Sequence, residues 1–444
     1  MQLPVNFIES IRGTKGFSED AFIKVHESEE RITSIRINPF KKSTIRNPQS
    51  KIPWADHGYY LETRPSFTFD PLFHAGCYYV QEASSMFLEQ ALKQTVDLSQ
   101  PLKVLDLCAA PGGKSTHLLS LISKESLLVS NEVIRSRANI LNANINKWGC
   151  SNVLVTNNDP RDFQRLKNYF DVIVVDAPCS GSGLFRRDPE AIREWSEQNV
   201  ALCSQRQQRI LADVLPALKN GGVLIYSTCS YSTEEDEEIC SWLVNELKVN
   251  SEKLKFKNEW RVIETEQGYR FWPDKVKGEG FFIACFRNNN EHDEEVYLPK
   301  IKPTKFSVKE MEILNKNVNT EGLAFLRYEK IVYAVPEKLL ADISFLSSKL
   351  RIVNCGTKVG EIIKDKLIPD HALALSNIIG DKIQRLDLDH EQAIQYLKKK
   401  ELRLQTDKKG WVLVTHQGHE LGWINILPNR INNYYPKELR ILKD

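Results

Sequence analysis

Short apolar segments alternate with helical patterns between residues 101 and 290 of this chain. Strand-like runs lie at 104–107, 127–132, 153–156, 171–176 and 221–228, and helical patterns lie at 135–148 and 199–218. Alternation of this kind favours a parallel sheet covered by helices. We therefore predict an α/β domain over 101–290, in which residues 281–286 form a last, edge-type strand.

Residues 1–100 mix short helical and strand-like patterns, which predicts an α+β extension before that domain. Residues 34–38 have the pattern of a strand that ends in a basic turn. Positive charge around this turn can contact a phosphate backbone, although a solvated loop explains the same charge equally well. The residues that carry it are Lys15, Lys41, Lys42, Arg46 and Lys51.

A second feature of the extension is the segment 76–86, which leads into an apolar helix that ends near Leu92. Its first apolar residues, Cys77, Tyr78 and Tyr79, are expected to lie in the core rather than in a site. Small and aromatic side chains of this kind are commonly buried.

The chain after the α/β domain has a different character. Residues 287–295 are polar and low in apolar content, which is typical of a linker. Residues 300–444 are then expected to form a separate, strand-rich region, with strands at 411–415 and 421–424 around a turn at 416–419. No internal repeat occurs.

Length and composition limit the class of protein. A chain of 444 residues predicts two or three domains. It has no apolar run long enough to span a membrane, and its first residues lack the pattern of a secretion signal. Its nine cysteines are scattered without paired metal-ligand spacing, which favours reduced thiols in a cytosolic protein without a metal site. The net charge of +2 does not by itself indicate a nucleic-acid partner, although local patches can provide one.

The segment 104–116 is the first candidate site. An apolar strand turns sharply through Pro111, Gly112 and Gly113 into a helical pattern, which is how α/β sheets build nucleotide crevices. A phosphate-binding P-loop of an ATPase requires a glycine where Cys108 stands, and the dinucleotide fingerprint G-x-G-x-x-G is absent. S-adenosylmethionine needs the turn but neither fingerprint, and an ordinary strand–helix turn is an equally open interpretation.

Two acidic residues follow the next strands of the predicted sheet. Glu132 ends the second strand, where a carboxylate commonly accepts hydrogen bonds from ribose hydroxyls. The alternative is an acid favoured by a helix dipole. Asp159, after the third strand, can bind an adenine amino group or cap the turn that begins at Pro160.

Two cysteines follow the fourth and fifth strands. Cys179 lies in Asp176-Ala-Pro-Cys-Ser-Gly-Ser-Gly and Cys229 in Tyr226-Ser-Thr-Cys-Ser, so both are expected to face one crevice. A thiolate suits covalent activation of a ring carbon such as carbon 5 of a pyrimidine, which is unreactive until a nucleophile adds at carbon 6. Two buried cysteines acting as small apolar residues are the alternative.

Three of these motifs, at 106–115, 176–183 and 227–230, resemble those of the Nol/Nop/Sun family of RNA 5-methylcytosine methyltransferases. The resemblance covers about 30–290 and implies a Rossmann-like, S-adenosylmethionine-dependent domain. It assigns Cys229 as the nucleophile at carbon 6, Cys179 to product release, and Asp176 to the cytosine ring. It also implies a cofactor site made by Cys108, Ala109, Ala110, Pro111, Gly112, Gly113, Lys114, Glu132, Asp159 and Asp176.

The chain departs from the family pattern after the second cysteine motif. The family often continues to Glu-Asn, whereas residues 233–238 here are Thr-Glu-Glu-Asp-Glu-Glu. The sequence does not tell which role the missing Asn had.

The end of the chain, at 422–440, resembles the PUA-like RNA-binding tail of bacterial family members that modify small-subunit ribosomal RNA. Trp423 and Tyr434 are candidates to stack on bases, unless they belong to a small β core. Phosphate contacts are expected from Lys398, Lys399, Lys400, Arg403, Arg430 and Arg440.

Together these features predict a cytoplasmic, monomeric enzyme that methylates carbon 5 of a cytosine in RNA with S-adenosylmethionine. The target base must be unpaired or flipped out of its helix to enter a crevice. The tail favours 16S ribosomal RNA or a small-subunit particle, and transfer RNA is the second choice. The rival interpretation is a non-catalytic RNA-binding assembly factor, which the presence of both thiols disfavours.

Overall fold

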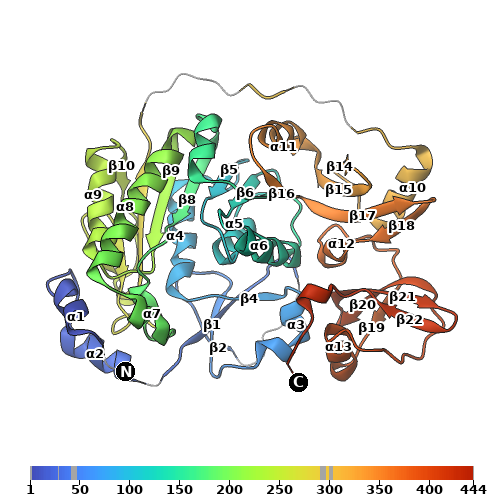
Figure 1. The fold of residues 1–444 in the computed structure, drawn as a ribbon, viewed down its shortest axis with the longest axis horizontal. Helices are drawn as coiled ribbons and strands as arrows, with labels where there is room; N and C mark the ends of the chain where they lie inside the picture. The colour runs from blue at the N-terminus through green and yellow to red at the C-terminus, as the bar shows by residue number, and fades with distance from the viewer. Residues whose placement is uncertain (1–2, 29, 42–47, 291–296, 300–303, 444) are drawn as a thin grey trace.

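The computed structural model describes residues 3–28, 30–41, 48–290, 297–299 and 304–443. Within these ranges, ten strands form one mixed sheet at the centre of the molecule, and three four-stranded sheets surround it. In Figure 1 the N-terminal helices lie beside one side of this central body, and the sheets of the C-terminal region lie at the opposite side.

Five parallel strands carry the central sheet, in the order β7-β6-β5-β8-β9, which confirms the predicted α/β fold. The strand order reverses beside β5, and such a point opens a crevice at the carboxyl ends of the strands. The bounds are β5 (Lys103–Asp106), β6 (Leu127–Asn131), β7 (Val153–Thr156), β8 (Phe170–Asp176) and β9 (Leu218–Thr228).

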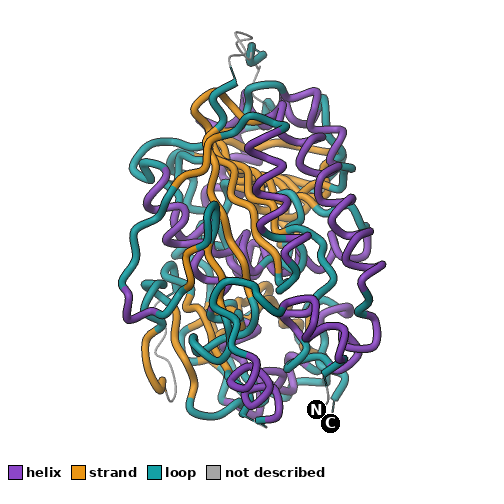
Figure 2. The backbone as a smooth tube through the Cα atoms, turned by 90° about the vertical axis from the view of Figure 1, so that its left-hand side faces the viewer, coloured by secondary structure: helices purple, strands orange, loops and turns teal. Residues whose placement is uncertain are grey.

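Both faces of the sheet are buried, which explains why its strands are continuous apolar runs. Val104 and Val172 pack on one face with α4, α5 and α6, while Leu105 and Ile173 pack on the other with α8 and α9. Figure 2 shows the strands side by side with helices next to them. The helices are α4 (Leu88–Thr95), α5 (Gly113–Leu121), α6 (Arg135–Trp148), α8 (Glu197–Val214) and α9 (Glu237–Asn245).

The prediction that residues 281–286 form an edge strand is wrong. Strand β13 (Phe281–Arg287) pairs antiparallel with β9 on one side and with β12 (Tyr269–Phe271) on the other. Beyond these lie β10 (Asn250–Glu252), which also pairs with β13, and β11 (Ile263–Glu264). Strands of two or three residues are too short to show a hydrophobic periodicity. The sequence therefore did not predict β10, β11 and β12, the short strands that lie beyond β13.

The N-terminal extension is α+β, as predicted, with helices followed by a four-stranded sheet in the order β2-β3-β1-β4. The helices α1 (Val5–Ile11) and α2 (Glu19–Glu27) lie near α7 (Pro189–Glu194) of the central domain (Figure 1). The remaining elements are β1 (Thr33–Ile37), β2 (Pro48–Lys51), β3 (Gly58–Leu61), α3 (Pro71–His74) and β4 (Tyr78–Val80).

Part of the predicted basic turn is not available to RNA. Lys41 is 8% exposed and its ammonium donates to the carbonyl of Ala75, so its charge holds the fold together. Lys42 and Arg46 lie outside the described residues, whereas Lys15 and Lys51 are exposed.

The three residues expected in the core differ in their burial. Cys77 is fully buried, and Tyr78 and Tyr79 are half-buried. The ring of Tyr79 lies against the turn that begins α5, within ordinary contact distance of a Cβ built at Gly113.

The C-terminal region contains two small sheets and also contributes to the central one. Strand β16 (Ile352–Cys355) pairs antiparallel with β7 and so extends the central sheet. The first small sheet has the order β14-β15-β17-β18. Its elements are α10 (Val308–Asn317), β14 (Leu323–Tyr328), β15 (Ile331–Pro336), α11 (Leu340–Ser347), β17 (Thr357–Ile363), β18 (Lys366–Pro369) and α12 (His371–Leu375).

The last sheet, β19-β20-β21-β22, contains the predicted hairpin, with a turn at Gln417 and Gly418. Trp423 is not a stacking platform, because it is 2% exposed and its indole N–H donates to the carbonyl of Asp370 at 2.8 Å. Tyr434 is 43% exposed and stays a candidate. The elements are β19 (Arg385–Asp387), α13 (His390–Leu397), β20 (Gly410–His416), β21 (His419–Leu427) and β22 (Arg430–Asn433).

No helix in the described part of the chain is long and apolar enough to cross a membrane.

Candidate active site

The turn between β5 and α5 lies at the carboxyl end of the central strand. Gly112 has φ of 112°, a conformation that side chains with a Cβ rarely adopt, so a glycine is needed there. Helix α6 holds the turn from outside: Arg137 donates to the carbonyl of Ala110 at 2.9 Å, and Asn144 donates to that of Pro111 at 2.8 Å. The turn is therefore fixed in one shape before any ligand binds.

A buried arginine from the N-terminal sheet also supports this turn. Arg36 is 1% exposed and donates to the hydroxyl of Thr116 at 2.6 Å and to the carbonyl of Gly113 at 3.2 Å. It donates to Gln81 at 2.9 Å as well, and its guanidinium lies over the ring of Trp148. These contacts identify Arg36 as the link between the extension and the turn.

Acidic groups converge on the inner side of the turn. Asp106 ends β5, is fully buried, and accepts a hydrogen bond from Ser115 at 2.6 Å. Burial raises the pKa of Asp106 to about 7. Burial also raises the pKa of Cys108, and the nearby charges of Asp106, Asp176 and Glu132 raise it further, so this thiol stays neutral.

Glu132 and Asp159 lie where the sequence placed them, beyond β6 and β7. One oxygen of Glu132 accepts from the backbone N–H of Ile134 at 2.9 Å, and the other lies 3.4 Å from Arg137. Asp159 accepts from the N–H of Arg161 at 3.2 Å, so it does cap the following turn. These contacts do not test the ribose and adenine roles, which stay predictions.

Lys114 and Asp176 connect the cofactor turn to the cysteine loops. The ammonium of Lys114 lies 2.7 Å from one oxygen of Asp176, and Ser227 donates to the other oxygen at 2.8 Å. Strands β8 and β9 pair in parallel with Asp176 opposite Ser227. One carboxylate therefore joins the ends of β8 and β9 to the first turn of α5.

The two candidate cysteines meet just beyond β8 and β9. The Sγ atoms of Cys179 and Cys229 are 3.2 Å apart, and all nine cysteines of the chain are free thiols. The contact with Cys229 and burial both raise the pKa of Cys179 well above its usual value, so Cys179 holds its proton. A neutral thiol can donate its S–H to a neighbouring sulfur. Cys179 can therefore hold a proton directly beside Cys229, the candidate nucleophile.

With the geometry described, the chain can be compared with known proteins. The profile described as "16S rRNA methyltransferase RsmB/F" matches residues 93–287. The profile of the N-terminal domain of 16S rRNA methyltransferase RsmF matches 3–83, and that of the RsmF PUA domain matches 384–441. Ribosomal RNA small subunit methyltransferase F of Shewanella loihica is 30% identical over 99% of this chain and 96% of its own length. The chain belongs to the ribosomal RNA small subunit methyltransferase F family.

Other proteins give the same result. Ribosomal RNA small subunit methyltransferase F of Vibrio parahaemolyticus is 33% identical over 91% of each chain. The crystal structure of a methyltransferase homologue from Pyrococcus horikoshii matches 64% of this chain and 100% of its own, with 27% identity and a TM-score of 0.51. This member of the family is therefore an S-adenosylmethionine-dependent methyltransferase with a PUA-type C-terminal domain.

The residues at the turn fit that cofactor. A Cβ at Gly112 would lie 3.3 Å from the side chain of Leu141 on α6, so the glycine lets the turn pack closely against that helix. The second oxygen of Asp106 is buried and has no hydrogen-bond partner among the described residues, so it can receive a polar group of a ligand. Asp106 was not among the residues that the sequence singled out, although it is the first residue of the motif.

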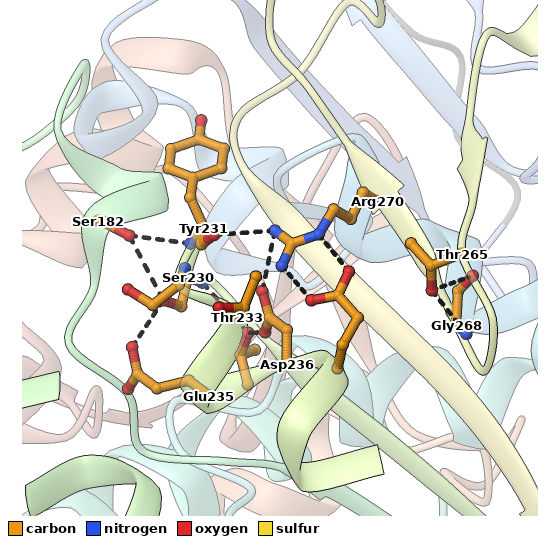
Figure 3. A network of polar contacts seen from close by, with 12 residues as sticks. Ser182, Ser230, Tyr231, Thr233, Glu235, Asp236, Thr265, Gly268 and Arg270 are labelled. Carbon is orange, nitrogen blue, oxygen red and sulfur yellow. Dashed lines mark hydrogen bonds and ion pairs between the residues drawn. The ribbon is translucent and has the colours of Figure 1, made fainter. Parts of the chain in front are cut away.

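This family member also has a buried carboxylate that joins the two cysteine loops. Glu235 is fully buried and accepts from the N–H of Ser180 at 2.7 Å and from its hydroxyl at 2.5 Å. Figure 3 shows that Glu235 also accepts from the hydroxyl of Ser230, at 2.6 Å. Residues next to both cysteines therefore share one acceptor. Burial raises the pKa of Glu235, and these hydrogen bonds oppose the rise.

The neighbouring Asp236 lies in the segment 233–238, where the chain departs from the family pattern. Asp236 is fully buried, accepts from the hydroxyl of Thr228 at 2.5 Å, and lies 3.1 Å from the guanidinium of Arg270 (Figure 3). Arg270, 2% exposed, also pairs with Glu237. Burial lowers the pKa of Arg270, but Asp236 and Glu237 outweigh it and the net pKa is raised, so the arginine keeps its charge. A buried carboxylate is tolerated here because a buried arginine faces it.

Proposed function

We propose that this protein methylates carbon 5 of a cytosine in 16S ribosomal RNA, in the cytoplasm where ribosomes are assembled. The observation that carries the proposal is the pair of free thiols 3.2 Å apart, Cys179 and Cys229, just beyond the ends of β8 and β9. The PUA-type domain and the names of the relatives support a ribosomal RNA substrate. Transfer RNA is the alternative substrate that the experiment below distinguishes.

Each residue has a chemical task in this proposal. Cys229 Sγ bonds to carbon 6 of cytosine, which moves the ring electrons so that carbon 5 becomes nucleophilic. S-adenosylmethionine supplies an electrophilic methyl group when it is bound. After transfer, removal of the carbon 5 proton lets the ring re-form its double bond and expel Cys229 as a thiolate.

Asp176 assists formation of the adduct, and Cys179 assists release of the product. Asp176 is held by Lys114 and Ser227, and it hydrogen-bonds the ring at nitrogen 3, which stabilises the adduct. Cys179 acts at removal of the carbon 5 proton: its thiol first gives up its own proton to solvent, and the resulting thiolate takes the carbon 5 proton as Cys229 leaves. Its raised pKa means that it enters the cycle carrying a proton rather than as a competing thiolate.

The test is transfer of labelled methyl from S-adenosylmethionine into RNA from a strain that lacks the protein, separated by size. We expect label in 16S RNA with the wild type and none with Cys229→Ala, whose affinity for the cofactor stays within about twofold of the wild type because the mutated group does not hold it. Label in transfer RNA would keep the chemistry and change the substrate. Turnover by Cys229→Ala would refute the assigned nucleophile.

Cys179→Ala provides an independent test of product release. If Cys179 acts after methyl transfer, this variant accumulates a protein–RNA adduct that survives a denaturing gel. The adduct must disappear in the double variant Cys179→Ala/Cys229→Ala. Equal amounts of adduct in the wild type and in Cys179→Ala would contradict the release role.

A further inference from the structure

A large cavity lies between the N-terminal extension and the central domain, outside the cofactor crevice. Its volume is about 680 Å³. The walls come from the end of α2 and the start of β1, from residues 80–83 after β4, and from the segments 186–189 and 278–279. Cavities of a few hundred Å³ hold small ligands of nucleotide size.

This cavity adjoins the cysteine loops through the backbone. The N–H of Gly183 donates to the carbonyl of Cys229 at 2.8 Å, and the N–H of Gly280 donates to the carbonyl of Gly183 at 3.3 Å. Arg186 is three residues after Gly183, and Glu279 directly precedes Gly280. The wall of the cavity is therefore one layer of backbone away from the proposed nucleophile.

Two buried polar atoms on the walls lack hydrogen-bond partners among the residues that the structure describes. His26 is 3% exposed, and its Nδ1 is 2.8 Å from the carbonyl of Phe22, so Nδ1 carries the proton and Nε2 is the free acceptor. Burial lowers the pKa of His26 to about 4, which keeps the ring neutral. The second atom is Oε2 of Glu279, which is 8% exposed, and burial raises the pKa of this carboxyl to about 7.

The charges on the rim complete the site. Arg64 and Arg187 line the cavity and are exposed, whereas the buried side chain of Arg186 is held by the carbonyl of Gly278 at 3.1 Å and lies 3.6 Å from Glu279. The carboxylate of Glu82 is occupied by backbone N–H groups of Ser84 and Ser85. The exposed acids Glu27 and Glu30 also stand on the rim, so the cavity does not attract anions along its whole edge.

In the interior, Nε2 of His26 is an acceptor without a partner among the described residues, and the carboxylate of Glu279 has Arg186 as its ion-pair partner at 3.6 Å. Together with the exposed guanidinium groups at the mouth, these acceptors match the parts of one nucleotide. Ribose hydroxyls and base N–H groups are donors, and a phosphate pairs with arginine. We propose that this cavity binds a nucleotide of the RNA strand that flanks the target cytosine. Its ribose or base lies against His26 and Glu279, and its phosphate lies against Arg64 and Arg187. The inference rests on the proposed function, because it takes the same RNA as its ligand.

The test measures the affinity of the full-length protein for 16S RNA from a strain lacking it, at several KCl concentrations. In the proposal Arg64 and Arg187 share one phosphate, so Arg64→Ala/Arg187→Ala is expected to reduce the slope of log Kd against log salt by about 0.7, the contribution of one neutralised phosphate of a single strand. The matched control is Arg165→Ala/Arg209→Ala, which removes two exposed arginines outside the cavity lining. The control is expected to keep the wild-type slope.

His26→Leu separates the interior from the rim. Because it removes an acceptor but no charge, it is expected to weaken RNA binding by about tenfold with an unchanged slope. An unchanged affinity for S-adenosylmethionine shows that each variant is folded.

The two proposals fail in different ways. A wild-type slope in Arg64→Ala/Arg187→Ala, or a wild-type affinity in His26→Leu, overturns the cavity assignment even if the enzyme methylates 16S RNA. Absence of methyl transfer by the wild type instead refutes the proposed function. The salt slope still decides in that case whether the cavity contacts RNA.

Discussion

Glu235→Ala is the substitution that most directly tests how the two cysteines are held together. The carboxylate accepts from Ser180 N–H, from the hydroxyls of Ser180 and Ser230, and from Gln207 at 3.3 Å. These groups do not all lose their partners in the variant. The two hydroxyls are 3.4 Å apart and can bond to each other, and Gln207 also donates to the carbonyl of Pro178 at 3.0 Å.

The N–H of Ser180 is the donor that stays without a partner. An unsatisfied buried donor costs about 1–3 kcal/mol. Burial raises the pKa of Glu235 because a buried charged carboxylate is unfavourable. Removing this carboxylate therefore offsets part of the cost of the unsatisfied N–H. We therefore expect Glu235→Ala to lower the free energy of local opening at the Cys179 loop by about 2 kcal/mol, which corresponds to about 30-fold faster amide exchange at Ser180.

The functional consequence follows from geometry. Without the shared acceptor, the loops that carry Cys179 and Cys229 lose their common support, and a displacement of about 1 Å at a reacting group lowers a rate by about 100-fold. The single-turnover rate of methyl transfer is therefore expected to fall by about 100-fold, while the affinity for S-adenosylmethionine changes little. Glu235→Gln retains an acceptor for Ser180 and should recover most of the rate.

Glu238→Ala is the matched control, because Glu238 is exposed on α9 only three residues away. It should leave both amide exchange and rate close to the wild type. If Glu235→Ala exchanges the Ser180 amide at the wild-type rate and transfers methyl at full speed, then the carboxylate does not support the loops.

Three other substitutions test the surroundings of the site. Asp106→Asn removes a buried carboxyl whose pKa is raised from 3.8 to about 7. In urea unfolding, the wild type should therefore lose stability relative to this variant as pH rises from about 4 to about 7. A stability difference that does not change with pH would contradict this. Arg270→Met should destabilise the protein by about 3–5 kcal/mol because Asp236 becomes a buried, unpaired charge, and adding Asp236→Asn should restore part of the loss in the same assay. Arg36→Met should weaken cofactor binding and speed proteolysis within residues 3–83, because Arg36 connects the N-terminal extension to the turn that begins α5. Equal proteolysis of the wild type and the variant would rule out this connecting role.

The sequence determined those features that depend on neighbours along the chain. The parallel strands were readable because strands buried on both faces are continuous apolar runs. The turn at Gly112 was readable because its backbone conformation favours glycine. Since parallel strands end at the same edge, the positions of Cys179 and Cys229 after two such strands were enough to predict that they meet. Their separate roles came from the family resemblance.

Tertiary structure alone decided the features that depend on contacts between distant segments. Arg36 reaches Thr116 across 80 positions, and Glu235 reaches Ser180 across 55, so no local pattern marks either of them. The same reason explains the error of burial at Lys41 and decides between the two interpretations of Trp423 in favour of a small β core. Lys41 and Trp423 have polar groups that suggest a surface role, but the carbonyls of Ala75 and Asp370 satisfy them inside the protein. A sequence gives the chemical capacity of a side chain, whereas its partners and its exposure depend on how the whole chain packs.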